Sequence, residues 1–289
     1  MREGRASRTA AWVAAGRGLG VLLPEDARLC DDPYGVRFSE AERLLRLARR
    51  APRLSARVIA PAFAPGILYM QVRTRVIDDA LRAFVASGGR QVVLLGAGFD
   101  CRAARFAREL EGGVVFEVDH PATQARKRRV LDGEPAAKTV YLAWNFEAGR
   151  PVGELPRALA EAGHDPGEPT LTIWEGVTMY LTEGAIDATV RAVRAYSTPD
   201  ARFAFTYFDR GPLEHPTVSM RLRRRVVAGA GEPFRFGWDP ADLPAWMRAR
   251  GFEILGDREA REWARELLPA RWASRCAGAG SHIAVAAAR

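Results

Sequence analysis

The chain has 289 residues, of which 48% are hydrophobic, so it is long enough for one large α/β domain or two small ones, and we favour one. Its three cysteines are odd in number and far apart, so they indicate neither a zinc site nor a disulfide framework, and a reduced cytoplasm is the expected compartment. Basic residues outnumber acidic ones by 43 to 35, which gives a net charge of +8. The sequence shows no recognised nucleic-acid-binding motif that would explain this charge.

The first part of the chain is predicted to be helical. Ser39 and Glu42 have the spacing of a capping box, which predicts a helix over residues 40–50. Residues 67–87 have an amphipathic pattern and are followed by two glycines, which predicts a second helix that ends there. The longest apolar stretch, residues 58–70, contains two prolines and is too short to span a bilayer, so we expect no membrane span.

Beyond residue 88, apolar runs alternate with helical patterns or loops. The predicted strands cover residues 92–95, 114–118, 139–143, 170–174, 203–207, 253–255 and 282–286. Runs without polar alternation are typical of strands that are buried on both faces of a parallel sheet. The order of elements therefore predicts an α/β fold with a doubly wound sheet.

The first strand leads into a glycine turn, in the stretch "VVLLGAGFDCRA". Gly96, Ala97 and Gly98 follow the strand, and Asp100 is placed to cap a helix that begins at Cys101. Glycines permit unusual dihedral angles and let a ligand approach the backbone, close to the free N–H groups of the next helix. A tight turn without a ligand is the alternative.

The second strand ends in Asp119 and His120, before a helix that starts near Pro121. Asp119 lies 21 positions after Gly98, close to the spacing of about 20 at which nucleotide-binding βαβ units place a carboxylate on the ribose hydroxyls. The alternative is that Asp119 only caps the following helix. Together, the glycine turn and the spaced acid favour a ribose-bearing ligand.

Two common nucleotide-binding motifs are incomplete in this sequence, which narrows the choice of that ligand. A dinucleotide fingerprint needs Gly or Ala where this chain has Cys101, and no phosphate-loop Lys follows the turn. A nucleoside without phosphate fits better, and S-adenosyl-L-methionine is the common one. After the third strand, Asn145 can bond an adenine edge and Phe146 can pack on its face, although Asn145 is also a frequent turn residue.

Several segments together resemble the leucine carboxyl methyltransferase family, which includes bacterial O-methyltransferases of polyketide biosynthesis. These segments are "RTRVIDDAL", "VVLLGAGFDCRAARF", "FEVDHP" and "WEGVTMYL", and the resemblance covers most of the chain. It implies a Rossmann-like sheet of seven strands, the last pair antiparallel, with a helical cap. The predicted division is a single domain of residues 1–289, with an N-terminal helical cap over 1–87, a core over 88–289 and a cap insertion over 209–236.

The resemblance also implies residue roles. Glu175 would meet the amino group of the cofactor's methionine, and Arg73 would meet its carboxylate, as charge complementarity and a bidentate Arg allow. Arg73 could instead pair with Asp78 or Asp79 on its own helix. Relatives usually have Asp-Leu where this chain has Asn145 and Phe146, which makes the adenine contact less secure.

Two residues are candidates for the catalytic site. Tyr180 would lie one turn past Glu175, near the methyl-transfer site in the family, although a half-buried wall is the alternative. His215, in the supposed cap, is the one histidine placed to reach a substrate as a general base; a surface residue is the alternative. No metal is required, because the sulfonium methyl group is already activated.

The predicted function is O-methylation of a small molecule, with a carboxylate of a polyketide-like or other secondary metabolite as the expected acceptor. A carboxylate is ionised at neutral pH and needs no general base, whereas a hydroxyl group does. Hydroxyl methylation is the alternative, and an NAD(P)-dependent oxidoreductase a weaker one. The basic runs at 126–129 and 221–225 are interpreted as solvated helix faces, although they suit an acidic substrate. We expect a monomer or a homodimer.

Overall fold

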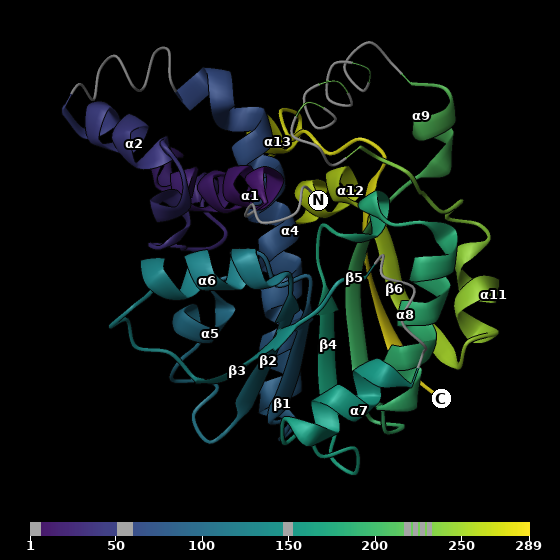
Figure 1. Cartoon of the computed structure of the whole chain (residues 1–289). Coiled ribbons are helices and arrows are strands. Elements are labelled where there is room, and N and C mark those ends of the chain that lie inside the picture. The colour runs from purple at the N-terminus through teal and green to yellow at the C-terminus, as the bar shows by residue number, and fades with distance from the viewer. Residues whose placement is uncertain are drawn as a thin grey trace.

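The computed structural model describes residues 7–50, 60–146, 153–216 and 233–289, together with residues 221, 225 and 229. In this part of the chain, seven strands form one sheet in the order β3-β2-β1-β4-β5-β7-β6 (Figure 1). The strands are β1 (Gln91–Leu95), β2 (Val114–Asp119), β3 (Lys138–Ala143), β4 (Thr170–Trp174), β5 (Arg202–Phe208), β6 (Phe252–Glu259) and β7 (Ser281–Ala288).

The direction of the strands matches the prediction. β1 to β5 pair in parallel, so their carboxyl ends lie at one edge of the sheet. β7 runs antiparallel to both β5 and β6, which confirms the antiparallel last pair. Each of the seven predicted runs lies inside one observed strand. Open α/β sheets bind their ligands outside the carboxyl ends of the parallel strands, so this edge is where we look for the site.

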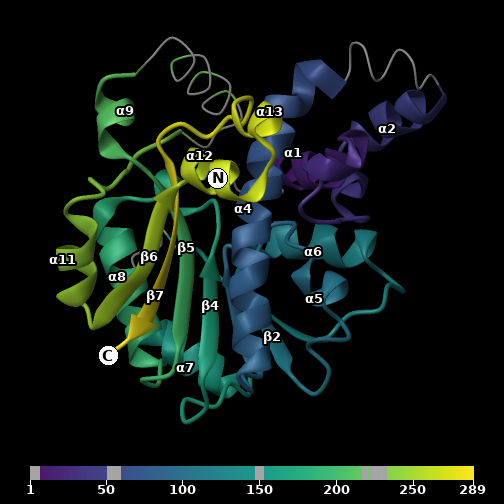
Figure 2. The ribbon, with the colours of Figure 1, turned by 180° about the vertical axis from the view of Figure 1, so that it is seen from behind.

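Helices cover both faces of the sheet (Figures 1 and 2). Val92 and Leu94 of β1 point into one core, and their neighbours Val93 and Leu95 point into the other, as the alternation of side chains along a strand requires. The first core includes α4 (Ala60–Ala86), α5 (Arg102–Arg105) and α12 (Ala260–Leu267). The second includes α7 (Glu154–Glu161), α8 (Glu183–Ala195) and α11 (Leu243–Arg248).

Helix α4 is longer than the sequence predicted. It begins at Ala60 instead of residue 67 and contains Pro65. A proline inside a helix removes an intrahelical hydrogen bond, so the sequence favoured a later start. In the structure the Pro65 carbonyl accepts a bond from the Ala277 N–H at 3.0 Å, so a remote segment supports this turn. The helix ends before Gly88, whose φ of 97° favours glycine.

The N-terminal elements pack above the carboxyl ends of the strands. They are α1 (Arg8–Gly18), three short 3₁₀ turns, η1 (Leu19–Leu22), η2 (Glu25–Ala27) and η3 (Gly35–Phe38), and α2 (Ala41–Arg50). The predicted helix over 40–50 is confirmed as α2, and the Ser39 hydroxyl accepts a bond from the Ala41 N–H at 3.1 Å. Three further helices are α6 (Pro121–Val130), α9 (Arg210–Glu214) and α13 (Ala270–Ala273).

The division into a cap over 1–87, a core over 88–289 and an insertion over 209–236 stays a prediction, and parts of both cap segments lie outside the described residues. Within the described ranges, no helix has both the length and the apolar character needed to cross a membrane.

Candidate active site

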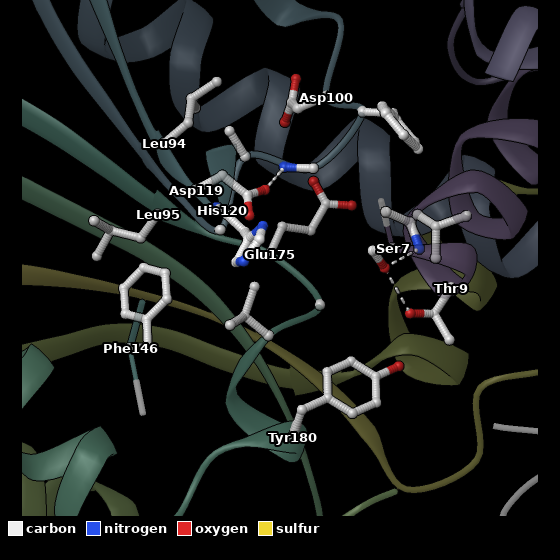
Figure 3. Close-up of a pocket in the computed structure, with 18 of the residues that line it drawn as sticks. Ser7, Thr9, Leu94, Leu95, Asp100, Asp119, His120, Phe146, Glu175 and Tyr180 are labelled. Carbon is white, nitrogen blue, oxygen red and sulfur yellow. Dashed lines mark hydrogen bonds between the residues drawn. The ribbon is translucent and has the colours of Figure 1, made fainter. Parts of the chain in front are cut away.

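A cavity of about 420 Å³ lies at the carboxyl ends of the parallel strands (Figure 3). Its walls come from the segments that follow β1, β2, β3 and β4, from α1, and from residues 233–235. The sequence predicted eleven of its lining residues: Arg73, Gly96, Ala97, Gly98, Asp100, Asp119, His120, Asn145, Phe146, Glu175 and Tyr180. The roles of these residues stay predictions, but the fold brings all eleven to one place.

The glycine turn after β1 requires both of its glycines. Gly96 has a φ of 64° and Gly98 a φ of 51°, which side-chain-bearing residues rarely adopt. A Cβ at Gly96 would lie 2.4 Å from Val177, and one at Gly98 would lie 3.2 Å from Ala10 of α1. The turn lines the cavity, and its backbone is closely approached by Val177 and Ala10.

Asp100 lies one residue before Cys101, the N-cap of the short helix after that turn, so the prediction that Asp100 is the cap is wrong. Its Oδ1 accepts a hydrogen bond from the Arg102 N–H at 2.7 Å, and its Oδ2 pairs with the Arg102 side chain. The helix starts at Arg102, one residue later than predicted, because Cys101 has the non-helical dihedrals of a cap residue. Asp100 thus shapes the turn and lines the cavity.

Asp119 lies at the end of β2 and faces the turn. Its Oδ2 accepts a bond from the Gly98 N–H and its Oδ1 accepts one from the His120 N–H at 2.5 Å. The alternative that Asp119 caps α6 is wrong, because His120 is the cap and its Nδ1 accepts a bond from the Ala122 N–H at 3.2 Å. Burial raises the pKa of Asp119, although both backbone bonds oppose this shift.

Glu175 follows β4 and lies between two arginines. Arg73 Nε donates to its Oε1 at 2.7 Å, and Arg102 Nη1 donates to its Oε2 at 2.7 Å. The Glu175 side chain is only 7% exposed, so burial alone would raise its pKa. Arg73, Arg102 and Arg17 outweigh burial and lower the pKa of Glu175, which keeps the carboxylate ionised.

The alternative partners of Arg73 are occupied elsewhere. Asp78 pairs with Arg102 and Arg105, and Asp79 pairs with exposed arginines of its own helix. The prediction that Arg73 could pair with Asp78 or Asp79 is therefore wrong. Spacings of five and six positions point these side chains to other sides of α4.

Sequence reasoning missed two arginines of this site. Arg17 of α1 lines the cavity, and its guanidinium bonds Asp32 at 2.9 Å and the Phe99 carbonyl at 2.6 Å. Arg102 touches Glu175 from behind the cavity wall. A single Arg inside the apolar run "AAWVAAGRG" was the available signal for Arg17; Arg102 had none beyond its place after the glycine turn.

The other end of the cavity is aromatic. Tyr180 belongs to the 3₁₀ turn η5 (Thr178–Tyr180), and its ring lies 5.6 Å from that of Phe234. The Arg235 N–H donates to the Met179 carbonyl at 2.7 Å, which fixes residues 233–235 beside Tyr180. Figure 3 shows Tyr180 across the cavity from Asp119, with Ser7 and Thr9 on a third side.

His215 is not part of this cavity. It lies exposed at the end of α9, where its N–H donates to the Gly211 carbonyl at 2.8 Å, and it does not line the cavity. The sequence placed it in a cap over the substrate, but much of that segment is outside the described residues. Of the basic run 221–225, the structure describes only Arg221 and Arg225, and both are exposed.

The basic run 126–129 is not a solvated face throughout. Lys127 is 1% exposed, and its ammonium group lies 2.7 Å from both oxygens of Glu117 in β2. The interpretation was wrong for this residue because the helical face of α6 that carries Lys127 turns toward the sheet. Among the described residues, no group of three or more His, Cys, Asp or Glu side chains is arranged to hold a metal ion.

The fold is Rossmann-like, with a cavity at the carboxyl ends of its parallel strands. The crystal structure of a duf574 family protein from Streptomyces avermitilis is similar with a TM-score of 0.59, at 14% identity over 98% of each chain. That of a "putative methyltransferase" from Thermobifida fusca has a TM-score of 0.57, at 15% identity, over 100% of this chain and 97% of the other. At these identities the likeness shows the fold alone.

Sequence comparison is more specific. The model of the leucine carboxyl methyltransferase family matches residues 10–194. A Streptomyces coelicolor protein named "Putative S-adenosyl-L-methionine-dependent methyltransferase" is 35% identical over 235 residues, 79% of this chain and 77% of its own. A similarly named Frankia alni protein is 36% identical over 206 residues, 70% and 68% of the two chains. The chain therefore belongs to the leucine carboxyl methyltransferase family, and the alternative of an NAD(P)-dependent oxidoreductase is wrong.

Proposed function

We propose that this methyltransferase transfers the methyl group of S-adenosyl-L-methionine to a carboxylate of a small molecule, such as a polyketide-like or other secondary metabolite. The methyl donor is the one named for its relatives, and the family establishes the enzyme class. The choice of acceptor rests on the groups that line the cavity.

The cofactor would lie along the strand ends. The backbone of Gly96 and Gly98 would face it, and Asp119 would bind the ribose hydroxyls, since each of its oxygens accepts one described bond and keeps a second lone pair. Asn145 and Phe146 are proposed for adenine. The methionine end, which carries one positive and one negative charge, would meet Glu175 and Arg73.

The proposal of a carboxylate acceptor rests on one observation: the described residues that line the cavity include no free general base. Asp119 is assigned to the ribose hydroxyls, Asp100 is bonded by the Arg102 N–H and side chain, and Glu175 accepts from two arginines. His120 accepts at Nδ1, so its ring proton is on Nε2 and that nitrogen is a donor. A hydroxyl acceptor benefits from a base worth about 10² to 10⁴ in rate, whereas an ionised carboxylate needs none.

The reaction balances without a proton transfer. A carboxylate oxygen forms a bond to the methyl carbon while the sulfur–methyl bond breaks, and its electron pair goes to sulfur. The negative charge of the acceptor and the positive charge of the sulfonium disappear together. The protein must hold the oxygen about 3 Å from the methyl group, in line, with water excluded. Tyr180 and Arg235 line the acceptor end, and Arg235 suits a carboxylate.

The test uses the whole chain with S-adenosyl-L-methionine labelled in the methyl group and fractions of acidic small molecules. A methyl ester releases labelled methanol in mild alkali, and we expect this result. An alkali-stable labelled product would show hydroxyl methylation instead. In a thermal-shift assay, S-adenosyl-L-homocysteine should raise the melting temperature and NAD should not, because only a ligand of the native state stabilises it.

A further inference from the structure

Glu175 uses both of its oxygens before any ligand arrives. Arg73 Nε holds Oε1 and Arg102 Nη1 holds Oε2, each at 2.7 Å. In the proposed function Glu175 binds the ammonium group of the cofactor, so each arginine beside it needs a role of its own. The structure distinguishes them by their surroundings.

Arg73 lies on the cavity wall. Its Nε bonds Glu175, and its terminal nitrogens Nη1 and Nη2 lie over Gly176, 3.6 and 3.8 Å from where a Cβ would be. These are ordinary van der Waals distances, so the guanidinium lies next to the Gly176 backbone at the edge of the cavity. Arg73 is therefore placed to bind a ligand directly.

Arg102 lies behind the wall and does not line the cavity. Its side chain is 3% exposed, and its Nε donates to Asp78 of α4 at 2.8 Å. Its Nη1 also contacts Asp100. With Asp78 in front of its Nε and Glu175 in front of its Nη1, the planar guanidinium bridges α4 to the segment after β4.

The charges of this cluster balance. Apart from the Arg17–Asp32 pair, which is itself balanced, three acids, Asp78, Asp100 and Glu175, face three bases, Arg73, Arg102 and Arg105. A neutral cluster can admit a zwitterionic group, which adds one charge of each sign, without leaving a buried charge uncompensated. Removal of Arg102 would leave three acids with two bases.

We propose that Arg102 is a positioning residue, which holds the Glu175 carboxylate ionised and oriented for the amino group of the methionine end while Arg73 binds the carboxylate of that end. This inference rests on the proposed cofactor. Its consequence is a selective one: Arg102 matters for ligands that carry the amino acid end and not for those that carry only the nucleoside.

The test compares two probes by calorimetric titration. S-adenosyl-L-homocysteine carries the amino acid end, and 5′-deoxy-5′-methylthioadenosine has the same nucleoside and sulfur without it. Arg102→Gln should weaken binding of the first about 10- to 100-fold, as for the loss of charged hydrogen bonds, and leave the second within about twofold. Arg105→Gln is the matched control, because Arg105 shares Asp78 and α5 but does not touch Glu175.

A pH profile separates positioning from general support of the fold. Glu175 is faced by Arg17 of α1, Arg73 of α4, Arg102 of α5 and the acid Asp100. In the wild type the arginines hold the pKa of Glu175 below its usual range, so this carboxylate is ionised at pH 5 to 8. In Arg102→Gln the pKa of Glu175 rises, so the loss of S-adenosyl-L-homocysteine binding should deepen as the pH falls.

Each outcome decides one question. Equal losses for both probes, or a flat pH profile in Arg102→Gln, would overturn the positioning role. If that variant does not fold, Arg102→Lys takes its place; its single ammonium cannot bridge Asp78 and Glu175, so a selective loss of a few-fold is expected and an equal loss overturns the role. A wild type that binds neither probe would overturn the proposed cofactor itself. Equal affinity of the wild type for both would overturn only the inference.

Discussion

Two buried glutamates of the same sheet differ in what surrounds them. Glu175, after β4, faces the cavity with Arg73 and Arg102 on its two oxygens. Glu117, inside β2, pairs with Lys127 and does not line the cavity. Burial is the largest influence on both pKa values and would raise each. The arginines reverse it for Glu175, whose pKa is lowered, whereas Lys127 does not for Glu117, whose pKa is raised.

The comparison teaches that the number of neighbouring cations, and not burial, decides whether a buried glutamate is held ionised. Asp100 and Asp119 add negative charge near Glu117 and oppose its ionisation. The Lys127 ammonium group compensates the charge of the buried Glu117 carboxylate. The pKa of Lys127 is raised, because the attraction of Glu117 outweighs the burial that would lower it. Mutations should therefore divide into effects on stability and effects on binding.

The largest expected effect is on stability. Lys127→Met leaves Glu117 buried without its partner, so the free energy of unfolding should fall by about 3 to 5 kcal/mol. Urea denaturation measures the change. The double variant Lys127→Met, Glu117→Leu should recover most of the loss, because no buried charge is left unpaired. If the single variant unfolds like the wild type, the pair has no structural role and the comparison fails.

The second effect is on cofactor binding. Glu175→Gln removes the negative charge proposed for the ammonium group, so binding of S-adenosyl-L-homocysteine should weaken by about 1.5 to 3 kcal/mol. Calorimetric titration measures it. The matched control is Glu117→Gln, which changes the other glutamate in the same way and should leave the affinity of the folded protein unchanged. Equal affinities in the two variants would contradict the difference drawn between them.

Asp119 sharpens the comparison, because it combines a pKa raised by burial with a place in the cavity wall. Asp119→Ala should weaken binding of S-adenosyl-L-homocysteine by about 1 to 3 kcal/mol, the loss of hydrogen bonds to two ribose hydroxyls. Titration with 5′-deoxy-5′-methylthioadenosine should show the same loss, since that probe keeps the ribose. Unchanged affinity for both probes would leave Asp119 with only its bonds to Gly98 and His120.

The pH dependence of stability should show the lowered pKa of Glu175. A carboxylate with a folded-state pKa below its unfolded value of about 4.3 stabilises the fold above that pH, and this contribution is lost as the pH falls toward the folded-state pKa. Acid titration of the melting temperature below pH 5 should therefore be steeper for the wild type than for Glu175→Gln. Parallel curves would mean that Glu175 is not held ionised by its arginines.

The smallest expected effect is at His215, which is exposed and lies outside the cavity. His215→Ala should leave turnover within about twofold of the wild type, because a carboxylate acceptor needs no base. Steady-state turnover with the identified acceptor measures this. A loss of about 10²-fold or more, with cofactor affinity unchanged, would instead make His215 a general base for a hydroxyl acceptor.

The strand ends were the most predictable part of this molecule. Apolar runs identify buried strands, and parallel strands bring their carboxyl ends to one edge, so Gly98, Asp119 and Glu175 could be placed together from sequence alone. These residues share one strong local signal, a strand that stops at a glycine or an acid. Their positions follow from the fold without knowledge of any side-chain packing.

Contacts between remote segments could not be predicted in this way. Arg17 meets the Phe99 carbonyl 82 positions away, and Arg102 meets Glu175 73 positions away. Lys127 reads as part of an exposed basic run, because only the tertiary packing of α6 shows that its face is buried. A charge run in a sequence does not say which of its members points inward.

Helix α1 gives the cavity a wall that stands outside the sheet. Arg17 ties it to the glycine turn, and Ala10 lies where a side chain at Gly98 would otherwise extend. A ligand that touches both α1 and the strand ends adds contacts that any local opening of α1 must break. The amide protons of α1 should then exchange with solvent more slowly when the cavity is filled. Amide exchange in α1, which lies far from the sheet in sequence, would thus report whether the cavity at the edge of the sheet is filled.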